Sequence, residues 1–380
     1  MGWSPSPERR PVQVEMIRAM APHVRIRLMV TSDLRKAEAA EALAAAGVDA
    51  ARVEFFSHPI SNFWMRDPGP HFVSDGRRLA VADFGWNAYG YPRELLIGSA
   101  NLQRHAVVLK LAERLNLPVV STAVVAEGGG LDVSDAVILA YRGTALQRNP
   151  DVPIETIERE YLRIYGKKKM VWLDQSPLAD RVFAGPKIAN YFGDGANGHI
   201  DEYARFVSND TLVIAQIDEA DAEDNPLSRA DHDILRDNLA QLRAATNVDG
   251  QPFHVIILPV PALRHHVRTT HLREQDKKSD TLNALYRDFK VGDEIHWVSA
   301  TSYLNFVVTN GVVLVPRYWR EGLPDRERDK DEQARRTLQG LFPDRQMVQI
   351  DPSDVNRSGG GMHCSTQQQP RLPGAVPPAR

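Results

Sequence analysis

The sequence contains a single cysteine among 380 residues, which excludes an internal disulfide and agrees with a reducing, cytoplasmic compartment. No apolar run approaches the ~18 residues of a membrane span, and the first ten residues lack the hydrophobic segment of a signal peptide. The formal net charge is −3 with both signs interspersed, so no basic surface is predicted for nucleic acid or an anionic membrane. These absences favour a small cationic ligand.

The one cysteine stands in an unusual setting near the C-terminus. Gly359, Gly360 and Gly361 precede it closely, and Cys364 is flanked by His363 and a polar Ser-Thr-Gln-Gln-Gln run. Consecutive glycines let a backbone take positive φ and approach a ligand closely. A lone cysteine is usually a small buried hydrophobic residue, so this segment alone supports a buried residue and a reactive thiol about equally.

Apolar residues alternate along the chain between helical and strand periodicity. Stripes at helical spacing occur in residues 154–164, 235–242 and 334–341, and residues 37–46 are rich in alanine. The pattern predicts an α/β chain. Short β-rich runs lie between the helices, at residues 24–30, 53–56, 79–84, 137–140, 170–173, 211–217, 254–260 and 311–315.

The predicted domain organisation is simple. The composition of 43% hydrophobic residues allows a large core, and we expect a single domain over residues 11–370. Residues 1–10, with two prolines, and residues 371–380 are predicted to be disordered tails. The histidines and arginines around residues 265–271 are predicted to form a solvated loop.

A repeat is the most informative pattern in the sequence. Four segments share one design, in which a polar turn joins an extended run to an apolar strand, as in a hairpin. Equivalent positions of a rotational repeat face a common axis, so acids at matching positions should converge there with His199 and Cys364. We therefore infer a propeller-like ring of αβ units. In three segments a carboxylate stands seven residues before the turn: Asp67 before Ser74, Glu127 before Ser134, and Asp201 before Ser208.

Several carboxylates, a histidine and a thiol suit one chemistry that needs neither cofactor nor metal. Carboxylates hold a planar guanidinium through paired charge-assisted hydrogen bonds. A cysteine can attack the central carbon, and the bound cation lowers the cost of forming the thiolate. A histidine can protonate the departing ammonia and then activate the hydrolytic water. The product would be a ureido group.

Seven segments carry a resemblance to a known family: residues 64–70, 87–90, 127–129, 148–150, 197–201, 302–306 and 361–370. In this order, from about Val12 to Pro370, they resemble the agmatine deiminase and bacterial peptidylarginine deiminase family. The resemblance implies the pentein fold, an α/β-propeller in which ββαβ-type units form a pseudo-fivefold ring around a central active site. It also implies hydrolysis of a guanidine through a covalent thiouronium intermediate.

The resemblance assigns roles to residues of this sequence. The nucleophile falls on Cys364 and the acid/base on His199. Asp67 and Asp201 match guanidinium-binding aspartates, and Glu127 matches the glutamate that orients the histidine. The predicted substrate-binding residues are Trp64, which matches an aromatic pocket wall, Asp67 and Asp201, and also Arg66, Asn305 and Gly361.

The implied substrate is agmatine, converted to N-carbamoylputrescine and ammonia. The alternative is peptidylarginine deimination, because residues 130–147, directly after Glu127, lack the Thr-Thr-Glu-type run of typical agmatine deiminases. No cofactor, nucleic acid or membrane is expected as a partner, and a homodimer is kept open. Family members usually begin with an additional tryptophan-containing strand, which this sequence predicts to be absent.

Other interpretations remain open from the residues. Asp67 before Pro-Gly-Pro can be a turn residue, Glu127 can be a solvated loop acid, and His199 with Asp201 can be a structural pair on one strand face. An amidinotransferase shares the covalent half-reaction, and a non-catalytic guanidine-binding protein shares the scaffold. A metal-dependent amidohydrolase would use Asp67, Glu127, His199, Asp201 and His363 as ligands.

Overall fold

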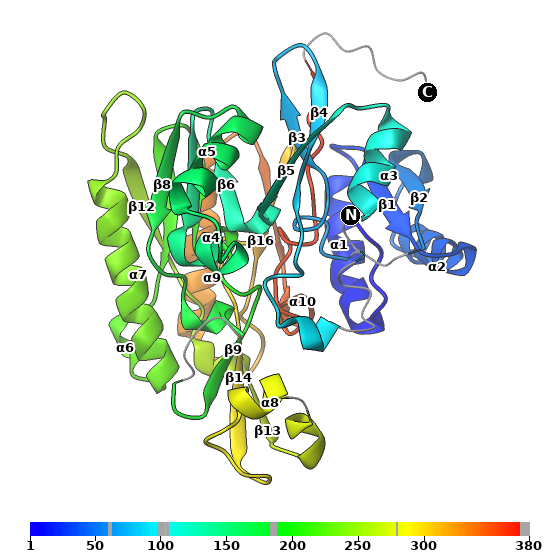
Figure 1. The fold of residues 1–380 in the computed structure, drawn as a ribbon. Helices are drawn as coiled ribbons and strands as arrows, with labels where there is room; N and C mark the ends of the chain where they lie inside the picture. Colours follow the sequence, from blue (N-terminus) through cyan, green and yellow to red (C-terminus); the bar gives the residue numbers. More distant parts are fainter. Residues whose placement is uncertain (60–62, 97–102, 104–105, 183–187, 279, 373–380) are drawn as a thin grey trace.

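The computed structural model describes the chain except residues 60–62, 97–102, 104–105, 183–187, 279 and 373–380 (Figure 1). Helices and strands alternate, which confirms the predicted α/β class. The helices are α1 (Arg10–Met20), α2 (Asp33–Ala45), α3 (Ala106–Leu115), α4 (Arg142–Arg148), α5 (Ile154–Tyr165), α6 (Glu219–Ala222), α7 (Pro226–Ala244), α8 (Asp280–Leu285), α9 (Asp325–Leu341) and α10 (Ser353–Asn356). Among the described residues, no helix has the length and apolar character that crossing a membrane requires.

The strands are short and spread along the whole chain. They are β1 (Ile26–Val30), β2 (Val53–Ser57), β3 (His71–Ser74), β4 (Leu79–Gly85), β5 (Val119–Val125), β6 (Leu131–Val133), β7 (Val137–Tyr141), β8 (Lys169–Leu173), β9 (Tyr191–Asp194), β10 (Ala204–Phe206), β11 (Thr211–Gln216), β12 (His254–Pro259), β13 (Val267–His271), β14 (Glu294–Ser299), β15 (Val307–Val308), β16 (Val312–Pro316) and β17 (Gln346–Ile350). All eight predicted strand runs are confirmed within one or two residues at each end.

Four three-stranded sheets repeat one topology. In each, an antiparallel hairpin is followed by one or two helices and by a third strand that runs parallel to the second strand of the hairpin. A parallel partner requires such a crossover, which the helices provide. The four predicted hairpins are confirmed. The sheets are β3-β4-β5, β6-β7-β8, β10-β11-β12 and β15-β16-β17.

The crossover helices are set by local sequence signals. The α7 helix begins with Pro226 after Asn225, whose side chain accepts a hydrogen bond from the Ser228 N–H at 2.9 Å. This capping satisfies one of the free amides at the start of the helix. In α5 the buried positions Ile157, Tyr161 and Ile164 follow the helical period and cover the β6-β7-β8 sheet.

The N-terminal residues correct two predictions. Gly2 pairs in parallel with Met29 of β1, and the Trp3 N–H donates to the Met29 carbonyl at 2.8 Å. The Trp3 side chain is buried with Met16 and Ile17 of α1. Burial of this apolar surface anchors the N-terminal segment, which was predicted to be disordered because it contains two prolines. Residues 1–10 are therefore ordered, and residues 1–3 add an extended segment to the β1-β2 sheet. Most of the predicted C-terminal tail lies outside the described residues.

A sixth sheet, β13-β14-β9, corrects the prediction of a loop around residues 265–271. Val267–His271 pairs antiparallel with β14, and β14 pairs in parallel with β9. This sheet and α8 extend at the bottom of Figure 1, away from the four repeated sheets. Sequence periodicity missed it because β9 and β14 are about 100 residues apart in the chain.

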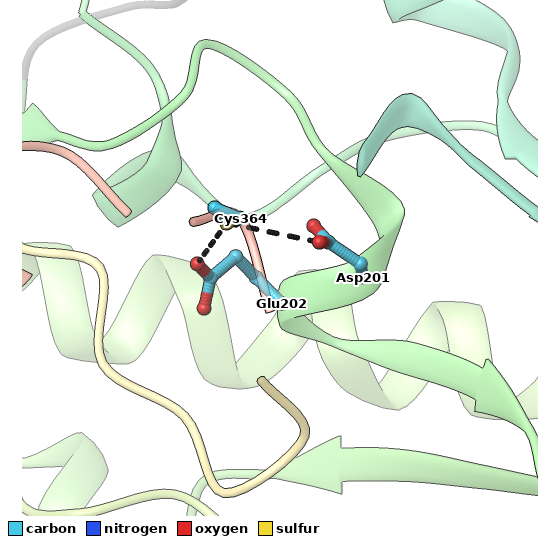
Figure 2. Close-up of side chains that lie close together, drawn as sticks. All are labelled: Asp201, Glu202 and Cys364. Carbon is cyan, nitrogen blue, oxygen red and sulfur yellow. Dashed lines mark hydrogen bonds between the residues drawn. The ribbon is translucent and has the colours of Figure 1, made fainter. Parts of the chain in front are cut away.

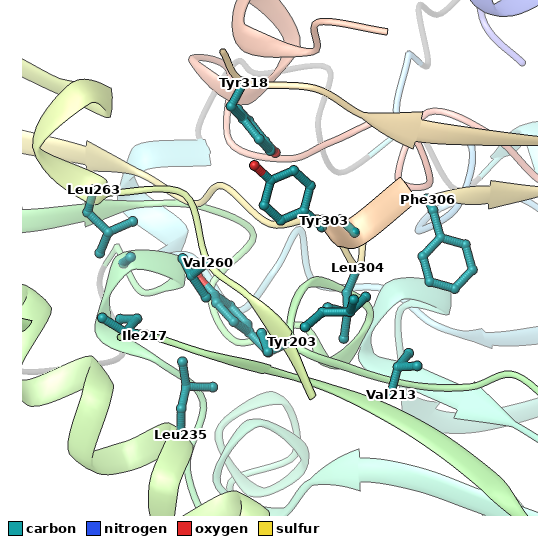
Figure 3. Close-up of a cluster of buried hydrophobic side chains, with 14 of the residues drawn as sticks. Tyr203, Val213, Ile217, Leu235, Val260, Leu263, Tyr303, Leu304, Phe306 and Tyr318 are labelled. Atoms are coloured by element: carbon teal, nitrogen blue, oxygen red, sulfur yellow. The ribbon is translucent and has the colours of Figure 1, made fainter. Parts of the chain in front are cut away.

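Part of the core holds the segment before β15 in place (Figure 3). Tyr303, Leu304 and Phe306 are fully buried. The Tyr303 hydroxyl donates to Asp331 Oδ1 of α9 at 2.7 Å, and the Ser302 N–H donates to the Tyr318 hydroxyl at 3.0 Å. Because its neighbours are fixed on both sides, Asn305 is presented in one orientation toward the interior.

Candidate active site

His199 lies between two carboxylates that come from different sheets. Its Nδ1 is 3.7 Å from Asp67 Oδ1, and its Nε2 is 3.5 Å from Glu127 Oε2. Asp67 precedes β3, Glu127 joins β5 to β6, and His199 precedes β10. All three side chains are buried. The structure thus brings together two acids at matching positions of the sequence repeat, Asp67 and Glu127, around His199.

Gly129, the second of the three glycines after Glu127, is explained by close approach. The Gly129 N–H donates to Asp67 Oδ1 at 3.0 Å. A Cβ at this position would stand 2.4 Å from His199 Nδ1 and 2.9 Å from Asp67 Oδ1, and 3.1 Å from Asp201 Oδ1. Real Cβ atoms do not come this close to other atoms, so only glycine fits between these side chains.

The loop that carries His199 is built around Asp180. The Asp180 carboxylate accepts hydrogen bonds from three backbone amides, those of Ala196 at 2.7 Å, Gly198 at 2.8 Å and His199 at 2.5 Å. Such a concave set of N–H groups binds an anion well. The buried Asp180 therefore fixes the backbone from which the His199 ring projects.

Arg148, at the end of α4, pairs with Glu127 beneath the histidine. Its Nε is 2.8 Å from Glu127 Oε1, and both side chains are 1% exposed. Its Nη2 also donates to the carbonyls of Ala196 and Asn197 in the His199 loop. Burial alone would raise the pKa of Glu127, but Arg148 and His199 outweigh burial and lower this pKa to about 2. Glu127 is therefore a permanent anion.

The charge around His199 determines its protonation. Burial disfavours the imidazolium, yet the negative charges of Asp67 and Glu127 outweigh burial and raise the pKa of His199 to about 9. His199 is therefore a protonated acid at neutral pH. A cation between two carboxylates is an arrangement that can release a proton to a leaving group and take one back.

Tyr89 closes this cluster from the loop after β4. Its hydroxyl donates to Asp67 Oδ2 at 3.1 Å, and its ring centroid is 5.7 Å from that of His199. Both Ala88 and Tyr89 have positive φ, at 55° and 66°. Left-handed non-glycine residues are uncommon and costly, so this loop retains strain in order to place the Tyr89 side chain against Asp67.

Cys364 lies beside two adjacent carboxyl groups (Figure 2). Its Sγ is 3.7 Å from Asp201 Oδ2 and 3.6 Å from Glu202 Oε1. Burial, followed by the charge of Asp201, raises the pKa of the Cys364 thiol well above its usual value. Without a cation bound nearby, the sulfur is therefore a thiol and not a thiolate.

Asn305 and Gly361 form the backing of the nucleophile. Asn305 Nδ2 is 3.2 Å from Cys364 Sγ, and Asn305 Oδ1 accepts the His363 N–H at 2.7 Å. A Cβ on Gly361 would stand 2.2 Å from Asn305 Oδ1, so this glycine is required for the contact. Both residues were predicted to bind substrate, and the structure places them against the nucleophile loop.

Trp64 and Arg66 flank the same loop on the side of Asp67. A Cβ on Gly360 would be 3.1 Å from the Trp64 ring and 3.3 Å from Cys364 Sγ, which places the indole beside the sulfur. The Arg66 N–H donates to the Cys364 carbonyl at 3.0 Å, and its Nε donates to the His363 carbonyl at 3.5 Å. Trp64 and Cys364 therefore both pack against Gly360.

His363 and Arg205 orient Asp201. Arginine only donates, so the 3.2 Å contact between Arg205 Nη2 and His363 Nε2 makes that nitrogen an acceptor. The proton is then on Nδ1, which donates to Asp201 Oδ2 at 2.6 Å. Burial and the Arg205 charge lower the pKa of His363 well below its usual value, so His363 is neutral. Within the described residues, Asp201 Oδ1 is buried without a hydrogen-bond partner.

One group of side chains has the spacing of a metal site. Among the described residues, Asp201, Glu202 and Cys364 each offer one atom within 4.8 Å of the others. This set differs from the five ligands considered for a metal-dependent amidohydrolase. The same three atoms are already in hydrogen-bonding contact through the Cys364 sulfur, so their spacing has an explanation that requires no ion.

Sequence reasoning gave no role to several residues of this site. Tyr89, Arg148 and Glu202 stand inside or beside the segments that carry the resemblance, and Arg205 follows Asp201 by four residues. Their closeness to these segments and to Asp201 was the sequence feature that could have indicated a role. Asp180 had none, because it acts through backbone amides that only the folded loop brings together.

Comparisons with known proteins agree with this geometry. Residues 3–370 match the family described as Porphyromonas-type peptidyl-arginine deiminase. The chain belongs to the Porphyromonas-type peptidyl-arginine deiminase family. An inferred agmatine deiminase of Streptomyces coelicolor is 30% identical over 84% of this chain and 79% of its own length. Another, of Selenomonas ruminantium, is 26% identical over 96% of this chain and 88% of its own.

Solved structures show that this member of the peptidyl-arginine deiminase family has the α/β pentein fold. The agmatine deiminase of Enterococcus faecalis is 23% identical, covers 98% of this chain and 92% of its own, and has a TM-score of 0.70. An agmatine deiminase of C. jejuni is 20% identical, covers 97% and 88%, and has a TM-score of 0.67. A cysteine-to-serine variant of the C. jejuni enzyme has been solved with substrate bound.

Proposed function

We propose that this chain hydrolyses a guanidino group to a ureido group and ammonia, and that its substrate is agmatine. The observation that carries the proposal is the position of one thiol beside a cluster of carboxylates and a protonated histidine, in which Asp201 Oδ1 has no hydrogen-bond partner among the described residues. A buried unpartnered acceptor is costly. A guanidinium supplies the donors and the positive charge that such a site needs.

Substrate binding and thiol activation are coupled in this mechanism. Asp67 and Asp201 hold the guanidinium, with Asp201 fixed by His363. The positive charge compensates the acids that raise the thiol pKa, so Cys364 loses its proton when the substrate is in place. The thiolate then attacks the central carbon. Alkylation and oxidation of the free enzyme are slow because its sulfur remains largely protonated.

His199 moves the remaining protons. As an imidazolium it protonates the departing amino group, so ammonia leaves and an S-alkylthiouronium remains on Cys364. The neutral imidazole then takes a proton from water, whose oxygen adds to the same carbon. Collapse breaks the C–S bond and releases the ureido product, and the hydroxyl proton of the intermediate passes to the sulfur, which restores the thiol. The proton that Cys364 releases to solvent on substrate binding balances the one that ammonia takes up as ammonium. The sum is one guanidine and one water converted to one ureido compound and one ammonia.

A small substrate fits the burial of the reactive groups. The Cys364 side chain is 1% exposed and His199 is 0% exposed, so a substrate must be enclosed to react. Agmatine is small enough to be enclosed, and inferred agmatine deiminases are among the curated relatives. The second candidate, deimination of arginine in a peptide, is favoured by the description of the matched family.

We also propose that residues 11–370 form one catalytic domain with a pseudo-fivefold ring. The four sheets of equal topology support four of its units. The β1-β2 sheet supports the fifth, because β1 and β2 pair in parallel across helix α2, as the second and third strands of the other units do across their helices.

The test is a side-by-side assay of agmatine, free arginine and an arginine-containing peptide for ammonia and ureido product. We expect the highest kcat/KM with agmatine. Citrulline in the peptide with agmatine inert would transfer the proposal to peptidylarginine deimination. Transfer of the amidino group to an added amine would indicate an amidinotransferase, loss of activity with chelators would indicate a metal enzyme, and no turnover of any guanidine would indicate a binding protein.

A further inference from the structure

Glu202 has no part in the mechanism above, although it touches the nucleophile. Its side chain is fully buried directly after Asp201. Glu202 Oε1 lies 3.6 Å from Cys364 Sγ and accepts a hydrogen bond from Asn305 Nδ2 at 2.9 Å. Its Oε2 has no hydrogen-bond partner in the described part of the chain. A buried carboxyl group with an unpartnered oxygen is costly to keep.

The contact between Glu202 and the Asn305 amide explains the role of the Glu202 carboxyl group. An amide has one acceptor oxygen and two N–H donors. Asn305 Oδ1 accepts the His363 N–H, and Nδ2 faces both Glu202 Oε1 and Cys364 Sγ, at 2.9 Å and 3.2 Å. A flipped amide would set its oxygen against the carboxyl oxygen and the sulfur, and would leave the His363 N–H unpaired. Glu202 and His363 therefore hold the amide with an N–H directed at the sulfur.

We propose that Glu202 is a positioning residue, which fixes the Asn305 amide so that an N–H donor faces the Cys364 sulfur as the thiolate forms. The inference rests on the proposed hydrolysis for its purpose, but the arrangement itself concerns only the enzyme. Hydrogen bonding to the charged form of a group favours that form. The pair thus assists the same ionisation that the substrate cation triggers.

The carboxyl group acts here in its neutral form. Burial and the adjacent Asp201 raise the pKa of Glu202 well above its usual value. An uncharged Glu202 can accept from Asn305 without repelling a thiolate 3.6 Å away. Glutamine has the same shape, no charge, and an oxygen that accepts from Asn305, so it should replace Glu202 in this role. Methionine has a similar volume and cannot.

The experiment measures alkylation of Cys364 by iodoacetamide at a fixed pH near 8, without substrate, alongside kcat and KM for agmatine. We expect Glu202→Gln to keep both the alkylation rate and kcat within about threefold of wild type. Glu202→Met should slow alkylation about tenfold and lower kcat about 30-fold or more with KM little changed, because the loss falls on thiolate formation. Mass spectrometry confirms that the adduct is on Cys364.

A double-mutant cycle separates positioning from general damage. Asn305→Ala should slow alkylation to the same extent as Glu202→Met, and the double variant should be no slower than either. Independent, multiplicative effects would overturn the proposal. The matched control is Glu327→Gln, a 1% exposed glutamate paired with Lys330 and remote from the sulfur, which should leave alkylation unchanged.

The other possible outcomes also test the positioning role of Glu202. If Glu202→Met fails to fold, as judged by circular dichroism, Glu202→Gln still tests the proposal, since a loss greater than about 30-fold in that variant would contradict a neutral positioning role. A stoichiometric metal ion in the wild type that is lost in Glu202→Gln would overturn it as well. If the wild type turns over no guanidine while the cycle is non-additive, the proposed function fails and the positioning role stands.

Discussion

At the scale of single residues, the charge on each group of the site depends on its neighbours. Glu127 is kept ionised by Arg148, His199 is kept protonated by the acids, and Cys364 is kept as a thiol by the acids and by burial, as the directions of their pKa shifts indicate. In the proposed mechanism, a bound guanidinium adds positive charge beside the sulfur and so lowers the pKa of the Cys364 thiol. The specificity for a cation is thus part of the chemical step.

The first prediction concerns Cys364→Ser. The serine hydroxyl is far less acidic than a thiol, so the substrate cation no longer suffices to ionise it. We expect a folded protein whose ammonia release from agmatine falls roughly 10⁴-fold or more, while calorimetry still detects agmatine binding. Appreciable turnover by this variant, or a trapped adduct on another residue, would rule out the covalent mechanism.

The second prediction concerns the two aspartates. Asp67→Asn and Asp201→Asn are nearly isosteric, so the fold should be kept. Each removes one partner of a buried charge pair with the substrate, which typically costs roughly 2–5 kcal/mol, and kcat/KM for agmatine should fall accordingly. Kinetics like those of the wild type in Asp201→Asn would remove that residue from the site.

The third prediction concerns Glu127 and the alkaline limb of the pH profile. The imidazolium of His199 must be present to protonate ammonia, so activity should decline as pH rises through its pKa of about 9. Glu127→Gln removes one of the charges that raise this pKa. The alkaline limb of kcat/KM should therefore move to lower pH. An unchanged limb would show that Glu127 does not act through His199.

The residues to which we assign the chemistry were predictable from the sequence, and those that support them were not. Asp67 and Glu127 stand at matching positions of a repeat, and His199 is close to Asp201, so sequence spacing alone indicates that these side chains meet. Arg148 supports Glu127 from a helix end, a contact that depends on how α4 packs and that its place in the segment 148–150 does not by itself reveal.

At the scale of elements, strand pairings encoded by nearby residues were predicted and pairings between distant residues were missed. The hairpin strands β10 and β11 are joined by a Ser-Asn-Asp turn, so their pairing is encoded within about a dozen residues. The pairing of Phe192 with Trp297 is encoded by nothing nearby, because loop closure over that length leaves no periodic trace. Trp3 was missed for a related reason, since its burial depends on helix α1.

The fourth prediction tests a crossover helix. Asn225→Ala removes the side chain that caps α7, and loss of an N-cap costs about 1 kcal/mol. Urea denaturation should show that loss in the free energy of unfolding, with kcat/KM unchanged, because α7 covers the β10-β11-β12 sheet and contributes no side chain to the site. A substitution of exposed Arg236, in the middle of the same helix, serves as the control. A large fall in activity without a fall in stability would contradict the assignment of α7 to stability alone.

At the scale of the whole molecule, the site is where separate sheets meet. Asp67, Glu127 and His199 come from three different hairpins, and Cys364 arrives from the end of the chain. None of these sheets can hold the cluster alone. The buried charges of the site are therefore part of the stability of the entire fold, and that stability should depend on pH.

The last prediction gives the direction of that dependence. The pKa of His199 is raised from 6.5 to about 9, so its contribution is full below pH 6.5 and is lost as pH rises through 9. The pKa of Glu127 is lowered from 4.5 to about 2, so its contribution is full above pH 4.5 and is lost as pH falls toward 2. Both contribute fully between about pH 4.5 and 6.5.

The measurement is the free energy of unfolding in urea at pH 6 and at pH 10, for the wild type, His199→Asn, and His254→Asn as a control at an exposed histidine of β12. The wild type and the control should lose stability between the two values by on the order of 2 kcal/mol more than His199→Asn does, because only His199→Asn lacks the buried imidazolium. An equal loss in all three proteins would mean that His199 is not held as a cation between the acids. The proton that the mechanism gives to ammonia would then have to come from another group.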